Sequence, residues 1–227
     1  MFDPHSRARL APQDAARFSG ETLFDRVGRA LSELDCLPRQ ELFEAWEVAR
    51  RVRRRFRGGR VVDFAAGHGL LAHLLLLLDD RSPRALAVDP SLPASAARVH
   101  EGLVAAWPRL AGRVELLARR LEDVALHSGD LVVSAHACGA LTDAVIGRAI
   151  AASARLAVLP CCHDARTCDD GGLGGWMDAA LAIDATRAAR LRAAGYRVHT
   201  QEIPAAITPK NRLLIAEPAG TVTQSTG

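Results

Sequence analysis

The chain has 227 residues, a formal net charge of +3 and 49% hydrophobic residues, which is typical of a globular protein with one large core. No apolar run approaches the roughly 18 residues that a membrane-spanning helix needs, and the N-terminus shows no secretion signal. The five cysteines are an odd number and Cys161 and Cys162 are adjacent. This usage argues against a disulfide framework and predicts a cytoplasmic protein.

Helical periodicity predicts two helices at the N-terminus, over residues 12–34 and 38–56, and Gly58 and Gly59 end the second one. Because both helices precede the first predicted strand, we expect them to form a cap on the main domain. The predicted organisation is a helical cap over residues 1–58, a main domain over residues 59–219 and a disordered tail over residues 220–227.

Strands and helices alternate after this cap, which predicts an α/β fold with a mostly parallel, Rossmann-like sheet. We expect strands at 60–64, 85–88, 114–118, 130–135, 156–159, 197–203 and 212–217. We expect one helix that follows the first strand and ends near residue 78, and three more over residues 92–107, 141–152 and 176–194. The last two strands are too close in sequence for a crossover helix between them. They are therefore predicted to form an antiparallel hairpin.

The most informative stretch is residues 61–71, which reads as a buried strand, a glycine turn at Gly67 and Gly69, and the start of a helix. Glycine lets the backbone approach a ligand closely, and the helix that follows points free N–H groups at it. Asp89 follows the next strand, where an acid accepts hydrogen bonds from ribose hydroxyls. One interpretation is a dinucleotide fingerprint, and hence an NAD(P)-dependent oxidoreductase.

Asp63 at the end of the first strand favours another ligand. A carboxylate there suits a cationic amino or sulfonium group and suits a pyrophosphate poorly. With Gly67 and Gly69, it resembles motif I of class I S-adenosylmethionine-dependent methyltransferases. Ala65 stands where that motif has its first glycine, which leaves open a protein that binds the cofactor without catalysis.

A second group of chemically capable residues follows the fourth and fifth predicted strands. Because the carboxyl ends of parallel strands meet at one edge of a sheet, we expect this group to converge beside the glycine turn; its members are His136, Cys138, Cys161, Cys162 and His163. His136 is a candidate general base, and a cysteine is either a nucleophile or a small buried hydrophobe. The set contains no C-x-x-C pair, and adjacent cysteines seldom chelate one ion, so we expect no metal here.

Three separated segments, residues 130–143, 159–163 and 207–212, together resemble one branch of the methyltransferase superfamily. Its members include the methyltransferase-like domain of the glutathione S-transferase C-terminal domain-containing protein, and a tRNA 2′-O-methyltransferase is a more distant relative. The resemblance implies the class I fold and S-adenosylmethionine as cofactor. It also implies a set of cofactor-binding residues, with His136 facing the methyl group or the acceptor: Asp63, Ala65, Gly67, Gly69, Asp89, Pro90, Glu122, Asp123 and His136.

The methyl acceptor is suggested only by charge. Arginines crowd the end of the second predicted helix, namely Arg50, Arg51, Arg53, Arg54, Arg55, Arg57 and Arg60. Such a cluster either binds a polyanion such as RNA or lies at the negative pole of the helix dipole. RNA is the slightly favoured acceptor, and a small molecule is nearly as well supported because aromatic residues, which stack on bases, make up only 4% of the chain.

Overall fold

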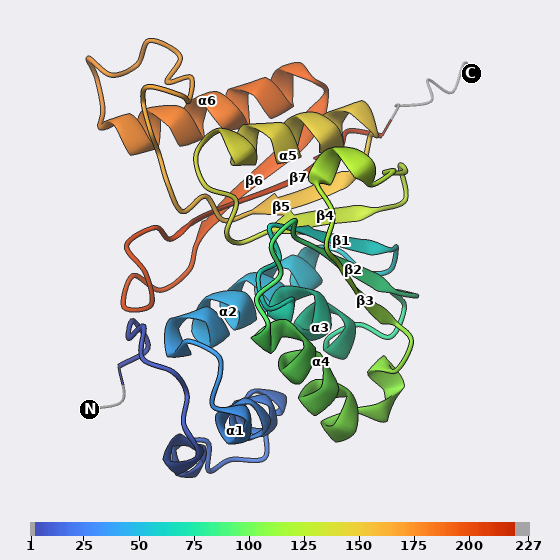
Figure 1. Cartoon of the computed structure of the whole chain (residues 1–227). Helices are drawn as coiled ribbons and strands as arrows, with labels where there is room; N and C mark the ends of the chain where they lie inside the picture. Colours follow the sequence, from blue (N-terminus) through green and yellow to red (C-terminus); the bar gives the residue numbers. More distant parts are fainter. Residues whose placement is uncertain (1–2, 221–227) are drawn as a thin grey trace.

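A seven-stranded sheet with the order β3-β2-β1-β4-β5-β7-β6 crosses the molecule in the computed structural model, which describes residues 3–220 (Figure 1). The strands are β1 Val61–Phe64, β2 Ala85–Val88, β3 Val114–Leu117, β4 Leu131–Ser134, β5 Arg155–Val158, β6 Tyr196–Glu202 and β7 Arg212–Pro218. Apart from Gly220, the expected tail lies outside the described residues.

Helices cover both faces of this sheet (Figure 1). One layer contains α1 Leu23–Leu34, α2 Arg39–Arg55, α3 Leu70–Leu77 and α4 Ser95–Ala106, and the other contains α5 Ala140–Ala151 and α6 Ala179–Ala193. The central strands are apolar throughout because both of their faces are buried. In β4, for example, Leu131 and Val133 belong to the core under α3, whereas Val132 belongs to the core under α5.

The N-terminal helices share a hydrophobic core with the sheet. Val27 of α1 and Val48 of α2 are fully buried in the same cluster as Leu74 of α3 and Val61 of β1. The boundary near residue 58 that the sequence predicts is therefore a change of element and not a gap in packing. None of the helices in residues 3–220 is long and apolar enough to cross a membrane.

The first predicted helix, residues 12–34, is two elements. A 3₁₀ helix, η1 Pro12–Arg17, ends before Gly20, and α1 begins after Thr22. The side chain of Thr22 accepts a hydrogen bond from the Asp25 amide at 3.2 Å, so it caps a new helix start. Periodicity alone missed this break because apolar residues continue across it. Short 3₁₀ turns also occur at η2 Pro108–Leu110 and η3 Leu121–Asp123.

The end of the sheet confirms the predicted antiparallel hairpin. Strand β7 pairs antiparallel with both β6 and β5, while β1 to β5 are mutually parallel. The six-stranded dinucleotide-binding sheet has the order 3-2-1-4-5-6, in which strand 6 lies directly beside strand 5. Here β7 lies between β5 and β6. The observed order therefore counts against the oxidoreductase interpretation.

The arginine cluster lies at the amino-terminal edge of the sheet, opposite the glycine turn, and most of it is engaged within the chain. Arg53 is 2% exposed and forms an ion pair with Asp79 at 3.1 Å. Arg50 and Arg51 pair with Glu47, Arg55 pairs with Glu217, Arg57 donates to the Leu78 carbonyl, and Arg60 pairs with Asp130. Arg53 therefore holds α2 against the end of α3.

We predict that Arg53→Ala lowers the free energy of unfolding by about 3–5 kcal/mol, because it leaves the buried Asp79 carboxylate without its cation. The neighbouring Arg54 is exposed, and Arg54→Ala is expected to change stability by less than about 0.5 kcal/mol. Urea denaturation of both variants measures the difference. Equal losses would contradict the structural role of Arg53.

Candidate active site

The turn between β1 and α3 has a left-handed backbone at three positions. The φ angles are 54° at Ala65, 52° at Gly67 and 72° at Gly69. This conformation costs an L-residue such as Ala65 roughly 1–2 kcal/mol, which explains why the equivalent position usually holds glycine. A Cβ built on Gly67 would meet no atom within 4 Å, so this part of the turn faces open space.

Asp63 is a buried carboxylate with an unsatisfied oxygen. It is 1% exposed, and its Oδ2 has no hydrogen-bond partner among residues 3–220. Burial raises the pKa of Asp63 well above its usual range, and the nearby carboxylates of Glu41 and Asp89 raise it further, although the Ala72 backbone lowers it. Within the part of the chain that the structure describes, no positive charge therefore compensates Asp63.

Asp89 lies at the tip of β2 and is fixed by two backbone amides. Its Oδ2 accepts from Gly67 at 3.2 Å and its Oδ1 accepts from Ser91 at 2.8 Å. Each carboxylate oxygen retains a further lone pair for a ligand. Asp89 borders a cavity of about 270 Å³, here named the Asp89 cavity, which is lined by Phe64, Ala65, Val88, Asp89, Pro90, Arg119, Arg120, Leu121, Glu122 and Leu141.

Four of the nine predicted cofactor residues line this cavity, namely Ala65, Asp89, Pro90 and Glu122. Its lining does not include Gly67, Gly69 or Asp123, and Asp63 and His136 border another space. Arg119, Arg120 and Leu141 were not predicted. They come from the segment after β3 and from the start of α5, which the fold brings to the same edge.

His136 borders two other spaces after β4. One is a narrow cavity of about 10 Å³, here the Asp63 cavity, lined by Glu41, Ala45, Asp63, Ala65, Ala66, Leu70, Leu71, Ala135 and His136. The other is a pocket of about 650 Å³, here the Cys138 pocket, lined by His5, Arg7, Pro38, Gln40, Glu41, Glu44, His136, Cys138, Cys161, Cys162, Thr208, Pro209 and Lys210. His136 therefore stands between the buried carboxylate and the large pocket.

Shared wall residues place the three spaces in one row along the carboxyl edge of the sheet. Ala65 lines both the Asp89 and Asp63 cavities. Glu41 and His136 line both the Asp63 cavity and the Cys138 pocket. A ligand that passes over Ala65 has one end at Asp89 and the other at Asp63, with His136 beside the second end.

Sequence reasoning missed the contribution of α2. Glu41 lies in the first turn of this helix and contacts His68 of the glycine turn, with His68 Nδ1 2.9 Å from Glu41 Oε2. The other ring nitrogen of His68 lies 2.9 Å from the hydroxyl of Ser95, the first residue of α4. This chain of contacts fixes the glycine turn between two helices. One signal of this contact was present in the sequence, which is His68 itself, a histidine between two glycines.

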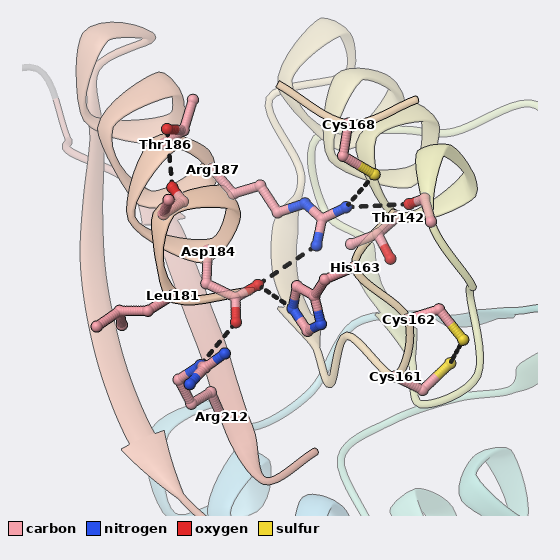
Figure 2. Close-up of polar contacts among 12 residues, drawn as sticks. Thr142, Cys161, Cys162, His163, Cys168, Leu181, Asp184, Thr186, Arg187 and Arg212 are labelled. Carbon is pink, nitrogen blue, oxygen red and sulfur yellow. Dashed lines mark hydrogen bonds and ion pairs between the residues drawn. The ribbon is translucent and has the colours of Figure 1, made fainter. Parts of the chain in front are cut away.

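The cysteines and histidines of the second predicted group separate into two sets. The Sγ atoms of Cys138, Cys161 and Cys162 lie together at the wall of the Cys138 pocket. His163 turns away, because its Nε2 lies 2.8 Å from Asp184 of α6 (Figure 2). His136 lines the same pocket but is not part of the cysteine cluster.

We predict that Asp63→Asn stabilises the ligand-free protein by about 1–3 kcal/mol at neutral pH, because it removes an unsatisfied buried carboxylate. The folded state, with its raised pKa, holds more protons than the unfolded state above about pH 4. The wild type therefore loses this part of its stability as pH rises, and the difference between the proteins closes at lower pH. Urea denaturation across pH measures it, with the exposed Asp123→Asn as control. A pH-independent difference would contradict the prediction.

Comparison with known proteins gives a family. The model of a family described as "Methyltransferase domain" matches residues 41–167, which contain Glu41, the glycine turn, Asp89 and both cysteine-bearing loops. No curated protein matches the chain.

Solved structures support the same fold. An O-methyltransferase family protein from Burkholderia thailandensis has a TM-score of 0.51 and 20% identity, covering 94% of this chain and 65% of that one. The methyltransferase SibL, described as S-adenosylmethionine-dependent, has a TM-score of 0.52 and 20% identity, covering 92% of this chain and 66% of that one. TrmK, a tRNA methyltransferase from B. subtilis, has a TM-score of 0.51 and 17% identity, covering 75% of this chain and 65% of that one.

At these identities the structural likeness shows the fold alone, and this chain spans 65% of the length of the first of these structures. The family match covers more than half of the 227 residues and includes the lining of the Asp89 and Asp63 cavities and part of the wall of the Cys138 pocket. The chain belongs to the methyltransferase domain family.

Proposed function

We propose that this protein transfers a methyl group from S-adenosylmethionine to a small acceptor bound in the Cys138 pocket. The observation that carries the proposal is the unpartnered Asp63 oxygen, buried between a cavity that suits a nucleoside and a pocket that suits an acceptor. The finer placement in the branch of the glutathione S-transferase C-terminal domain-containing protein rests on the three sequence segments and is part of this proposal.

The residues present fit this cofactor at both of its ends. Asp63 and Glu41 are two carboxylates beside one narrow cavity, and a cationic amino group neutralises the charge that burial makes costly there. Asp89 has lone pairs left for two ribose hydroxyls, and Pro90, Leu121 and Leu141 supply apolar walls for a base. The left-handed turn at Gly67 keeps side chains out of the space between them.

The cofactor supplies an electrophilic methyl group, and the chain supplies position and proton transfer. Asp63 and Asp89 fix the two ends of the ligand, so that most of the rate acceleration comes from orientation. His136 accepts the proton of a hydroxyl, amine or thiol acceptor from its place between the Asp63 cavity and the Cys138 pocket. The narrow Asp63 cavity, about 10 Å³, would leave little room for water around the cationic amino group.

The pocket favours a small acceptor over RNA. Its volume of about 650 Å³ is within the usual range for small-molecule sites. Lys210, Arg7 and His5 at its wall suit an acceptor with an anionic group. The arginines that suggested RNA lie at the other edge of the sheet, and Arg53 is buried in an ion pair. Turnover on cellular RNA with none on a metabolite extract would contradict this choice.

Thermal-shift titration tests the cofactor. We expect stabilisation by S-adenosylmethionine and S-adenosylhomocysteine and none by NAD or NADP. Asp89→Ala should weaken S-adenosylmethionine binding about tenfold to a hundredfold, because it removes charge-assisted hydrogen bonds to the ribose. The matched control is Asp80→Ala, since Asp80 is 87% exposed and pairs with Arg109 far from the glycine turn. Stabilisation by NAD, or equal binding by Asp89→Ala, would contradict the assignment.

We predict that His136→Ala lowers kcat by about 10²–10⁴-fold while the affinity for S-adenosylmethionine changes little, because the imidazole acts on the acceptor proton. The measurement is S-adenosylhomocysteine release with an acceptor found in a metabolite extract. His127→Ala is the control for losing an imidazole away from the site, since His127 is exposed and lies in the loop before β4. An unchanged kcat for His136→Ala would contradict this role and show that another group accepts the proton.

A further inference from the structure

Three thiols meet at one point of the Cys138 pocket wall. The Sγ atom of Cys138 lies 2.9 Å from that of Cys161 and 3.3 Å from that of Cys162, and the third separation, between Cys161 and Cys162, is 3.9 Å. All three cysteines are free. Cys138 follows β4 and the adjacent pair follows β5, so the fold brings together two loops that are 23 residues apart in sequence.

A buried network fixes these two loops against each other (Figure 2). Arg187 of α6 is 2% exposed and donates to the Gly139 carbonyl at 3.0 Å and to Asp143 at 2.8 Å, which anchors the loop of Cys138. Its Nη1 also donates to Asp184 at 3.3 Å. Asp184 in turn lies 2.8 Å from His163 Nε2, which anchors the loop of Cys161 and Cys162.

Two further contacts strengthen this arrangement. Arg212 of β7 donates to Asp184 at 2.8 Å, and the Gly139 amide donates to the Cys162 carbonyl at 3.3 Å. The cluster is therefore built on rigid elements through buried charges, which is how preorganised ligand sets are held. The sequence predicted that these cysteines converge, but their spacing argued against a metal because it contains no C-x-x-C pair. The distances between the three Sγ atoms and the anchoring charges on α6 are the new observations that favour one.

The chemistry of three thiols favours a soft cation. Thiolates are preferred ligands of Zn²⁺, and tetrahedral Zn–S bonds of about 2.3 Å place sulfur atoms about 3.8 Å apart. The longest side of the triangle, 3.9 Å, matches this spacing, and the other two, 2.9 and 3.3 Å, have to open by about 0.9 and 0.5 Å. Because the metal ligand is the thiolate, binding of a cation releases the thiol protons to solvent.

We propose that Cys138, Cys161 and Cys162 form a zinc site with three protein thiolates and a fourth position that faces the Cys138 pocket. Zinc sites with three protein ligands keep the fourth position for water or substrate. The pocket of about 650 Å³ leaves room for a small acceptor to supply that ligand through a sulfur, nitrogen or oxygen atom. Zinc binding itself is independent of methyl transfer, whereas the role of the fourth position rests on the proposed function.

The test measures metal on the full-length, reduced protein. We expect one zinc per chain by elemental analysis after dialysis against limiting free Zn²⁺, and a thiolate-to-metal charge-transfer band when Co²⁺ replaces it. Cys138→Ser and Cys162→Ser should each weaken zinc binding by more than about a hundredfold, beyond the loss typical of residues that only support a ligand. Addition of a small thiol to the Co²⁺ protein should shift the spectrum by entering the fourth position.

Cys36→Ala is the matched control, since Cys36 is a buried free cysteine outside the cluster, and it should bind zinc like the wild type. Less than stoichiometric zinc in the reduced wild type, or equal binding by Cys138→Ser, would overturn the proposal. A disulfide between Cys138 and Cys161 that persists under reducing conditions would also overturn it. Stabilisation by S-adenosylmethionine, measured on the same samples, reports separately on the proposed function.

Discussion

A buried carboxylate without a counter-charge is the constraint around which the active edge of this protein is organised. Asp63 ends the central strand β1, where sheet and helix bury it almost completely, and the carboxylates of Glu41 and Asp89 lie near enough to disfavour its charge. A fold keeps such a residue at a cost in stability, which is typical of functional sites. A cationic ligand removes that cost, so binding and the chemistry of the site are linked through one side chain.

The amino-terminal and carboxyl ends of the strands carry different kinds of residues. At the amino-terminal edge, Arg53 and Asp79 hold α2 to α3 through a buried ion pair. At the carboxyl edge, the tips of β1, β2, β4 and β5 carry Asp63, Asp89, His136 and the cysteines, and the cavities connect them. Most of the arginines that form one cluster in the sequence are therefore engaged within the chain, while the residues of the candidate site are far apart in the sequence.

Much of the fold was predictable because local signals agreed. The apolar run of β4 indicated burial on both faces, and the short connection before β7 indicated the antiparallel hairpin that the structure confirms. Asp63, Ala65 and Asp89 were predicted from their places at strand ends, and they line the cavities at the carboxyl ends of the strands. Glu41 was not, because its role depends on how α2 packs beside the glycine turn. The convergence of the cysteines was predicted from strand ends, but the side chains that hold their loops, Arg187 and Asp184, come from another helix and were not predicted.

The most direct test of this account is the pKa of the Asp63 carboxyl group, followed by its carbon-13 chemical shift with and without S-adenosylhomocysteine. The free protein should show a raised pKa, and the bound protein a much lower one, because the ligand's amino group places a positive charge beside the unpartnered oxygen. A pKa that is unchanged by a ligand known to be bound would contradict the central role given to Asp63.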